Sequence, residues 1–95
     1  MKVLGEAVVA KFAAKHAQSR KALARFIEIA GAANWPHPAA VRETFPSADY
    51  APKTGVIIFD IGGNKYRLIA VIDFPEQILL VRKVMTHEQY DKEKL

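Results

Sequence analysis

The chain contains no cysteine, and this absence removes several kinds of chemistry at once. Without thiols there is no disulfide, no thiolate metal site and no cysteine nucleophile. No apolar run approaches the roughly 20 residues that span a bilayer. Nothing after Met1 has the basic region, apolar core and cleavage site of a secretory signal. We therefore expect a cytoplasmic protein without a membrane partner.

Acidic residues are in deficit, with 10 Asp and Glu against 14 Lys and Arg, which gives a net charge of +4. The excess of cations favours anionic partners such as nucleic acid or an acidic protein, although many small basic proteins bind neither. The 95 residues, 51% of them hydrophobic, can bury one modest core. We expect a single domain over residues 1–95.

The first part of the chain has the pattern of two helices. Residues 1–4 suffice for a short strand, which Gly5 ends. Residues 6–16 carry apolar side chains at helical spacing, and a second apolar stripe follows over residues 23–30. Ser19 is placed to accept a backbone hydrogen bond as the N-cap of the second helix. We expect the two helices to form an antiparallel hairpin.

The basic residues of this hairpin allow two interpretations. They could follow a nucleic-acid backbone, because neutralising several phosphates releases counterions, or they could form an ordinary solvated surface. We favour the second for any single residue, while the whole cluster could help docking to a large anionic partner. These residues are Lys11, Lys15, Arg20, Lys21 and Arg25.

Two prolines within three residues forbid regular helix in the connector over residues 34–38. Trp35 in this connector most simply fills the core, and His37 has no partner at metal-ligand spacing. A short third helix follows, with Pro38 in its first turn. Residues 45–50 have the composition of an irregular loop.

The second half of the chain has the pattern of strands. We expect strands at residues 55–61, 65–74 and 78–84, with a hairpin turn at residues 62–64, where glycines accept positive φ. The middle strand would be central. The order of elements predicts an α+β fold, with the helical hairpin packed on one face of an antiparallel sheet and a short C-terminal helix.

Alternation along the central strand separates an apolar face, beginning at Tyr66, from a face that carries Lys65 and Arg67. Two cations at one end of a partly apolar surface are a plausible phosphate cradle. On the last strand, alternation puts only one of Arg82 and Lys83 on the face that carries Lys65 and Arg67. Arg82 shares its face with Ile78, Leu80 and Val84, and alternation alone does not decide between Arg82 and Lys83.

The C-terminal segment begins with Thr86 and has Gln89 three residues later, the pattern of a capping box. His87 and Tyr90 are three residues apart and share one side of this helix. The simpler interpretation is a polar terminal helix with Tyr90 packed on the sheet. The neighbouring cations favour a site, in which Asp91 could act only as a cap or a partner of a lysine.

Several of these segments together resemble the HigB toxins of bacterial type II toxin-antitoxin modules. The likeness spans nearly the whole chain, and its two motifs, G-N-K-Y-R-L and T-H-x-x-Y-D, are specific in combination. The matching residues are Phe45–Asp49, Phe59–Ala70, Arg82 and Thr86–Lys92.

The resemblance implies a RelE-like fold and an endoribonuclease that cuts mRNA in the ribosomal A site. It also implies a HigA-type antitoxin, a helix-turn-helix protein that binds the toxin. Asp60 departs from the pattern, in which asparagine is commoner, and a carboxylate there would lower the affinity for RNA if it pointed into the site.

Cleavage by attack of a ribose 2′-hydroxyl on the adjacent phosphate needs no metal ion or other cofactor. We assign Arg67 and Arg82 to the phosphate, because a guanidinium is a planar fork that stays charged. Lys65, and Lys83 in reserve, would help to bind RNA. Alternatively, Lys65 and Arg67 only keep an exposed sheet face soluble.

His87 is our candidate general base or acid, because histidine is the side chain that changes protonation nearest to neutral pH. Tyr90 would be its partner or a stacking platform for a base. The competing function is a non-catalytic RNA-binding or ribosome-binding module that uses the same basic face, or a structural partner of another protein.

Overall fold

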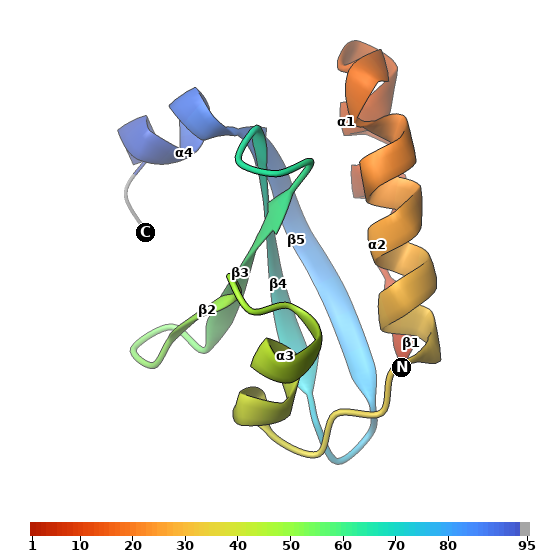
Figure 1. The fold of residues 1–95 in the computed structure, drawn as a ribbon, viewed down its shortest axis with the longest axis vertical. Coiled ribbons are helices and arrows are strands. Elements are labelled where there is room, and N and C mark those ends of the chain that lie inside the picture. Colours follow the sequence, from red (N-terminus) through yellow and green to blue (C-terminus); the bar gives the residue numbers. More distant parts are fainter. Residues whose placement is uncertain (94–95) are drawn as a thin grey trace.

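The computed structural model describes residues 1–93, and its five strands and four helices form two layers (Figure 1). None of the helices in this part of the chain is long and apolar enough to cross a membrane. The helical elements are α1 (Glu6–Lys15), the 3-10 turn η1 (Ala17–Ser19), α2 (Arg20–Ala32), α3 (Pro38–Thr44) and α4 (His87–Glu93). The strands are β1 (Lys2–Leu4), β2 (Asp49–Ala51), β3 (Val56–Ile61), β4 (Tyr66–Asp73) and β5 (Ile78–Thr86).

The sheet has the order β1-β5-β4-β3-β2, with β4 at its centre as the sequence predicts. The strands from β2 to β5 form an antiparallel meander, but β1 lies parallel to β5. The expected antiparallel sheet is therefore found from β2 to β5, whereas the parallel pairing of β1 makes the whole sheet mixed. The chain leaves β1 through three helices and returns much later to β5, and a parallel pair requires such a long connection.

The predicted loop over residues 45–50 is wrong at its end, because Asp49–Ala51 pairs with β3 as an edge strand. This strand has three residues, and it includes an aspartate and an alanine, which are depleted in strands. Its pattern is therefore too short and too polar to distinguish from a loop. The pairing with β3 decides its conformation.

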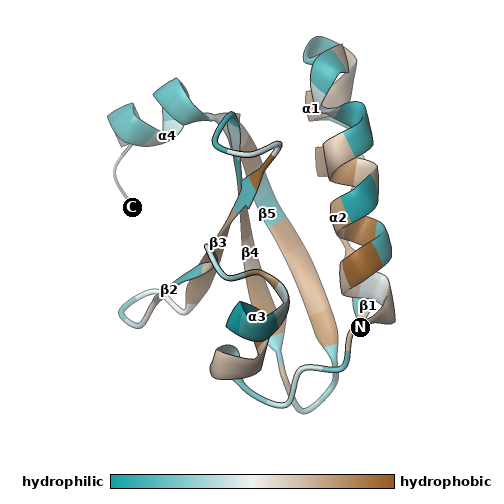
Figure 2. Cartoon of the chain, in the orientation of Figure 1, coloured by the Kyte–Doolittle hydropathy of each residue, from teal (hydrophilic) through white to brown (hydrophobic). Residues whose placement is uncertain are grey.

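One face of the sheet carries the main core, and α1, α2 and α3 pack against it. The apolar face of β4 lies on this side, as predicted. Figure 2 shows the apolar stretch along β5 and the alternating apolar and polar bands of α2. The core residues with the least exposed side chains are Leu23, Phe26, Ala30, Val41, Phe59, Leu68, Ala70 and Leu79.

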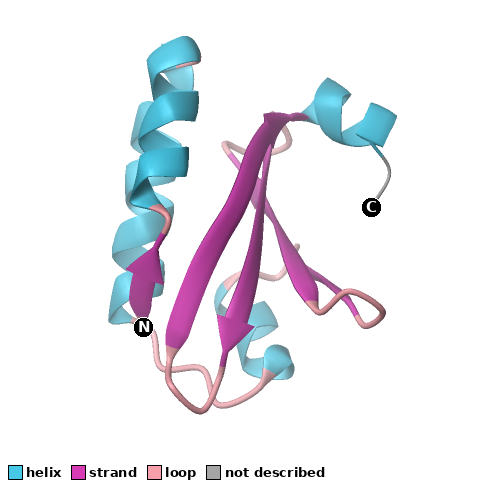
Figure 3. Cartoon of the chain, turned by 180° about the vertical axis from the view of Figure 1, so that it is seen from behind, coloured by secondary structure: helices cyan, strands magenta, loops and turns pink. Residues whose placement is uncertain are grey.

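The opposite face carries a second, smaller cluster that is centred on Ile58, Ile69 and Met85. Figure 3, seen from behind, shows the strands in front of α3, with α4 at their upper end. The predicted separation of faces along β4 is therefore confirmed. The end of this second face, next to α4, is where Arg67 lies.

Two capping residues differ from expectation. The hydroxyl of Ser19 donates to the carbonyl oxygen of His16 at 2.6 Å, so it does not cap α2 with its side chain. The reason is local: Ser19 ends η1 in helical conformation, and its hydroxyl closes that turn. His37, predicted as a loop residue, accepts a hydrogen bond from the backbone N–H of Ala40 at Nδ1 and caps α3.

Gly5 connects β1 to α1 with a φ of +89°. A Cβ atom at this position would lie 2.6 Å from the carbonyl oxygen of Val81, which is backbone and belongs to the paired part of β5. Both the positive φ and the close approach exclude a larger residue without strain. Gly5 thus sets how closely α1 lies against β5.

We predict that Gly5→Ala lowers the free energy of unfolding by about 2 kcal/mol, since it adds both backbone strain and a clash. The matched control is Gly31→Ala in α2, where the added Cβ would meet no atom from outside its own helical turn within 4 Å. That change is expected to raise the free energy of unfolding by about 0.5 kcal/mol through helix propensity. Chemical denaturation measures both, and equal effects in the two variants would contradict the role of Gly5.

Candidate functional site

Arg67 is the centre of the candidate site. It lies on β4, with Asp60 of β3 and Met85 of β5 as its cross-strand neighbours. Only 8% of its surface is exposed, and among the described residues only Ser19 is a comparably buried polar residue. The alternative that Arg67 merely keeps an exposed face soluble is therefore wrong.

All three nitrogens of the Arg67 guanidinium have partners within the protein. Nε lies 3.2 Å from Oδ1 of Asp60. Nη1 donates to the carbonyl oxygens of Tyr66 at 3.2 Å and Asn64 at 3.4 Å. Nη2 donates to Oδ1 of Asn64 at 2.6 Å and contacts Nδ1 of His87 at 3.0 Å. Each guanidinium nitrogen of Arg67 is therefore already engaged by another group of the protein.

The contact with Arg67 determines which nitrogen of His87 carries the hydrogen. An arginine can only donate, so Nδ1 of His87 must accept and is unprotonated. Nε2 then carries the hydrogen and lies 3.1 Å from Oδ2 of Asp91, one helical turn further on. His87 is thus held as the neutral Nε2–H tautomer, with both ring nitrogens occupied.

Tyr90 also contacts the same guanidinium. The Arg67 Cζ atom lies 5.6 Å from the centre of the Tyr90 ring, within the range of a cation–π contact. The ring also packs on the cluster of Ile58, Ile69 and Met85. Within residues 1–93 the Tyr90 hydroxyl has no hydrogen-bond partner, so this polar group is available at the site.

The predicted capping box holds the start of α4 in place. The backbone N–H of Gln89 donates to Oγ1 of Thr86 at 3.2 Å, and the backbone N–H of Thr86 donates to Oε1 of Gln89 at 3.0 Å. The backbone N–H of His87 also donates to the carbonyl oxygen of Lys65 in the β3–β4 turn, at 2.9 Å. The sequence correctly predicted this cap and the shared side of His87 and Tyr90.

Arg82 lies apart from this cluster, contrary to the predicted face. The β4–β5 pairing shifts between Ile69 and Ala70, which pair with Lys83 and Val81, so Arg82 is an extra residue in β5. Such a bulge reverses the alternation beyond it. Lys83, as the partner of Ile69, is therefore on the face of Arg67, whereas Arg82 lines a groove beside α1.

The remaining predicted cation, Lys65, is exposed in the turn before β4. Its carbonyl oxygen holds α4, as described above, while its side chain forms no ion pair within residues 1–93. The structure thus brings together Arg67, His87 and Tyr90 and places Lys65 at the rim.

Comparison with known proteins adds the family. Residues 19–93 match the HigB toxin family, described as the RelE-like toxic component of a toxin-antitoxin system. The protein belongs to this family. The mixed α+β architecture and the short C-terminal helix agree with a RelE-like toxin.

Two relatives of this HigB-family protein illustrate the range of similarity. The mRNA interferase toxin HigB of Escherichia coli K12 is 39% identical over 57 residues, which are 57% of this chain and 53% of the relative. The match thus spans about half the length of that relative. The mRNA interferase HigB of Escherichia coli O6:H1 (strain CFT073) is 27% identical over 93 residues, covering 97% of this chain and 90% of the relative.

Asp60, the position at which this HigB-family protein departs from the expected asparagine, does point into the site. Its carboxylate is partly buried and binds Nε of Arg67. The two charges compensate each other, so the cationic face is less positive than the sequence suggests. Sequence reasoning found Asp60 but not its partner, and it missed Asn64, whose side chain accepts the shortest hydrogen bond of Arg67.

We predict that Arg67→Lys lowers the free energy of unfolding by about 2 kcal/mol, because one ammonium group cannot satisfy acceptors on three sides. The matched control is Arg25→Lys, since Arg25 pairs with Glu28 while 70% of its side chain is exposed. That change should cost less than about 0.5 kcal/mol. Urea denaturation of both variants measures this difference, and a small effect of Arg67→Lys would refute the guanidinium as a structural centre.

We also predict the tautomer of His87. In ¹⁵N NMR spectra recorded above about pH 8, where histidines are neutral, its Nδ1 should have the shift of an unprotonated nitrogen and Nε2 that of a protonated one. The signals are assigned by their loss in His87→Ala. Asp91→Asn should preserve the tautomer, since the donor Arg67 remains. A protonated Nδ1 in the folded protein would contradict the Arg67–His87 contact.

Proposed function

We propose that this HigB-family protein is an endoribonuclease toxin that cleaves mRNA on the translating ribosome without a metal ion. The family and the relatives named mRNA interferase support the reaction class. The observation that carries the proposal is the cluster of Arg67, His87, Asp91 and Tyr90 at one end of the sheet. It combines a fixed cation with several groups that exchange protons.

The proposed step is attack of the 2′-hydroxyl oxygen on the adjacent phosphorus. The O2′–P bond forms and the P–O5′ bond breaks, giving a 2′,3′-cyclic phosphate and a free 5′-hydroxyl. One proton must leave the 2′-hydroxyl and one must reach the departing 5′-oxygen. Negative charge also grows on the phosphate oxygens, and fixed donors directed at it lower the barrier.

His87 is proposed to direct its Nε2–H at this phosphate. The ring nitrogen faces the accessible side, where both His87 and Asp91 are substantially exposed, at 43% and 59% of their side chains. An incoming phosphate oxygen can replace Asp91 as the acceptor, since an exposed pair is weakly held. Arg67 behind the ring polarises it and makes Nε2–H a stronger donor.

We propose that two neighbours of His87 carry out the two proton transfers. We assign removal of the 2′-hydroxyl proton to Asp91, because a carboxylate is an acceptor and this one leaves Nε2 when the phosphate arrives. We assign protonation of the 5′-oxygen to Tyr90, because its hydroxyl is a donor without a partner among the described residues. His87 then acts as an electrophile, and its own role as base or acid is not required.

Arg67 is proposed to act through its charge and through His87 rather than as a phosphate ligand, since each of its three nitrogens already has a partner within the protein. Contacts with the RNA backbone would come from Lys65 at the rim and from Lys83 on the same face of the sheet. Arg82 is left as an RNA-binding candidate outside the cluster. A HigA-type antitoxin and the ribosome are the proposed partners.

One observation favours the second candidate, a non-catalytic RNA-binding or ribosome-binding module. Both nitrogens of His87 and every guanidinium nitrogen of Arg67 are occupied within the protein. If an RNA phosphate does not displace Asp91 from Nε2 of His87, no ring nitrogen is available for catalysis. The site can then only bind RNA. The following experiment separates these two functions.

We predict that Tyr90→Phe and His87→Ala each slow cleavage of mRNA on programmed ribosomes by about 100-fold or more. The matched control is Tyr50→Phe, which removes the hydroxyl of an exposed tyrosine on β2 and should leave the rate unchanged. Mapping of RNA 5′ ends gives the rate, and thermal unfolding verifies that each variant is folded.

Equal cleavage by wild type and Tyr90→Phe would contradict the assignment of Tyr90. Wild-type protein that binds ribosomes but leaves mRNA intact would favour the binding module. Efficient cutting of naked RNA would refute ribosome dependence.

A further inference from the structure

The second face of the sheet, which carries Arg67, has a helix over it only at the end where α4 lies (Figure 3). The helices α1, α2 and α3 pack on the face of the main core. We call the half of the second face away from α4 the open half, with Val71, Asp73, Ile78 and Leu80 at its centre. Sheets usually bury an apolar face under another layer, but within the described chain no helix packs over the open half.

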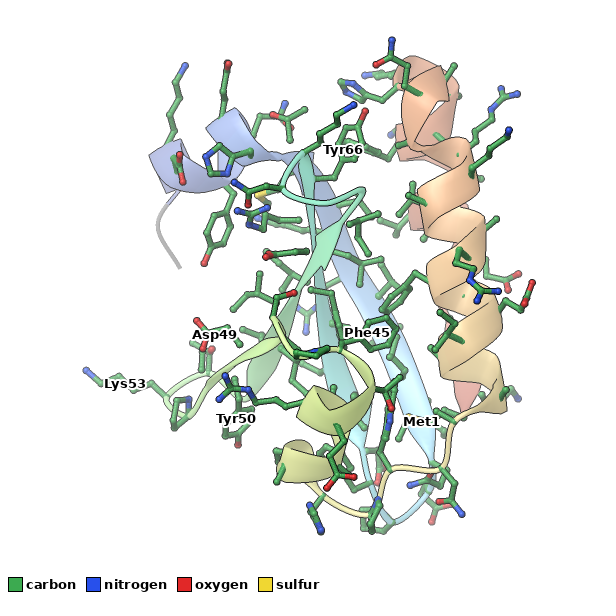
Figure 4. The ribbon with its side chains drawn as sticks, viewed as in Figure 1. Met1, Phe45, Asp49, Tyr50, Lys53 and Tyr66 are labelled. Carbon is green, nitrogen blue, oxygen red and sulfur yellow. The ribbon has the colours of Figure 1, made fainter. Side chains whose placement is uncertain are left out.

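One row of side chains on the open half is apolar across all five strands. The row begins at Leu4 on β1 and continues through paired positions to the β2 edge. In Figure 4, Met1 lies near the β1 edge, while Asp49 and Tyr50 mark the β2 edge, so the row spans the width of the sheet. The members of this apolar row are Leu4, Leu80, Val71, Val56 and Ala51.

Two members of the apolar row are unusually open to solvent. Leu4 and Leu80 keep 39% and 37% of their surface exposed, and they are two of the three exposed large hydrophobic residues in the described part of the chain. Single exposed apolar side chains are ordinary. These two are direct cross-strand partners, and Leu80 continues the row into Val71. Contiguous apolar surface of this kind is typical of an interaction site.

The neighbouring row on the open half carries one charge of each sign. Lys2 of β1 and Asp73 of β4 lie on either side of Ile78 of β5, about 10 Å apart by the ordinary spacing of strands. Both are exposed, and neither forms an ion pair within residues 1–93. Asp73 does accept the backbone N–H of Glu76, at 3.2 Å. The row therefore has one positive and one negative end.

This arrangement is complementary to itself. A second copy can lie face to face on the first, with a two-fold axis that runs parallel to β5 between the two sheets. Strand β1 of each copy then lies over β4 of the other, so Lys2 faces Asp73 in two equivalent contacts. In the apolar row, Leu4 faces Val71, and Leu80 meets its own copy at the axis. Such reciprocal contacts are what a two-fold interface requires.

From the apolar row and the reciprocal charges, we propose that the open half binds a second copy of this chain in a symmetric dimer. The two sheets form a sandwich, in which each apolar face covers the other. Lys83, in the next row towards α4, would meet Lys83 of the second copy, and this approach of like charges bounds the contact on that side. The inference is independent of the proposed cleavage, because it concerns only association of the chain with itself.

RNA is a poorer fit to the open half. Its two rows contain one cation and one carboxylate, and they contain no aromatic side chain. Binding of a nucleic-acid backbone draws on several cations acting together, and bases stack on open aromatic rings. Neither feature is present in these rows of the described structure, whereas a second apolar sheet gains free energy from burying them.

Sedimentation equilibrium of the full chain over a concentration series tests the dimer. We expect a dissociation constant of about 10–100 µM, because the contact covers only part of one face. Leu80→Lys places two like charges at the axis and should weaken dimerisation by about tenfold or more. The matched control is Tyr50→Lys, since Tyr50 is equally exposed but pairs with Ile57 on the face of the main core. It should change the dissociation constant by less than about threefold.

Charge reversal tests the reciprocal contacts themselves. Lys2→Glu brings two carboxylates together in each contact, and Asp73→Lys brings two ammonium groups together, so each variant alone should dimerise about tenfold more weakly than the wild type. In an equal mixture of the two variants, every introduced charge faces its opposite in the other copy. Dimerisation should therefore recover to within about threefold of the wild type. Mixing cannot repair a defect within one chain, and thermal unfolding confirms that each variant is folded.

A wild-type protein that stays monomeric up to about 1 mM would overturn the proposal. So would equal effects of Leu80→Lys and Tyr50→Lys, or a mixture of the charge-reversal variants that does not recover. The same variants are titrated with labelled cognate antitoxin and with a labelled oligoribonucleotide. If the wild type is monomeric and Leu80→Lys weakens either binding, the open half belongs to that partner and the dimer is wrong.

Discussion

The structure of the site depends on the burial of one guanidinium. A charged group taken from water must be compensated, and Arg67 is compensated by a carboxylate, an amide, two carbonyl oxygens and an imidazole. These acceptors come from β3, the turn that follows it, the first residue of β4, and α4. The requirement to satisfy Arg67 therefore fixes where α4 begins, which tautomer His87 adopts and how the turn before β4 is shaped.

The elements that could be predicted from the sequence are those whose signal is local. The capping box of Thr86 and Gln89, the proline at the start of α3 and the alternation of β4 each require only neighbouring residues to agree. The predictions that were wrong concern residues whose conformation depends on a neighbouring element. Ser19 is a residue type that often caps helices, but its hydroxyl bonds within η1. Residues 49–51 form a strand because they pair with the edge of β3.

The bulge in β5 explains why the candidate site was predicted only in part. Alternation predicts faces only while the register holds, and one extra residue, Arg82, exchanges the faces of all residues after it. No residue type in this stretch marks the bulge, because all the residues from Leu80 to Val84 are compatible with a regular strand. Likewise, a motif identifies Arg67 and His87, but only the three-dimensional contacts show that Asp60 and Asn64 occupy the donors of Arg67.

Helix α4 lies between the candidate site and the groove that Arg82 lines, and its two sides differ. His87, Tyr90 and Asp91 share the side of Arg67, whereas Gln89 and Lys92 line the groove. A seven-residue helix is not stable by itself, so its position follows from its contacts. Gln89 also forms the cap of this helix, whose first residue is His87. The cap therefore connects the side of α4 that lines the groove with the side that contacts Arg67.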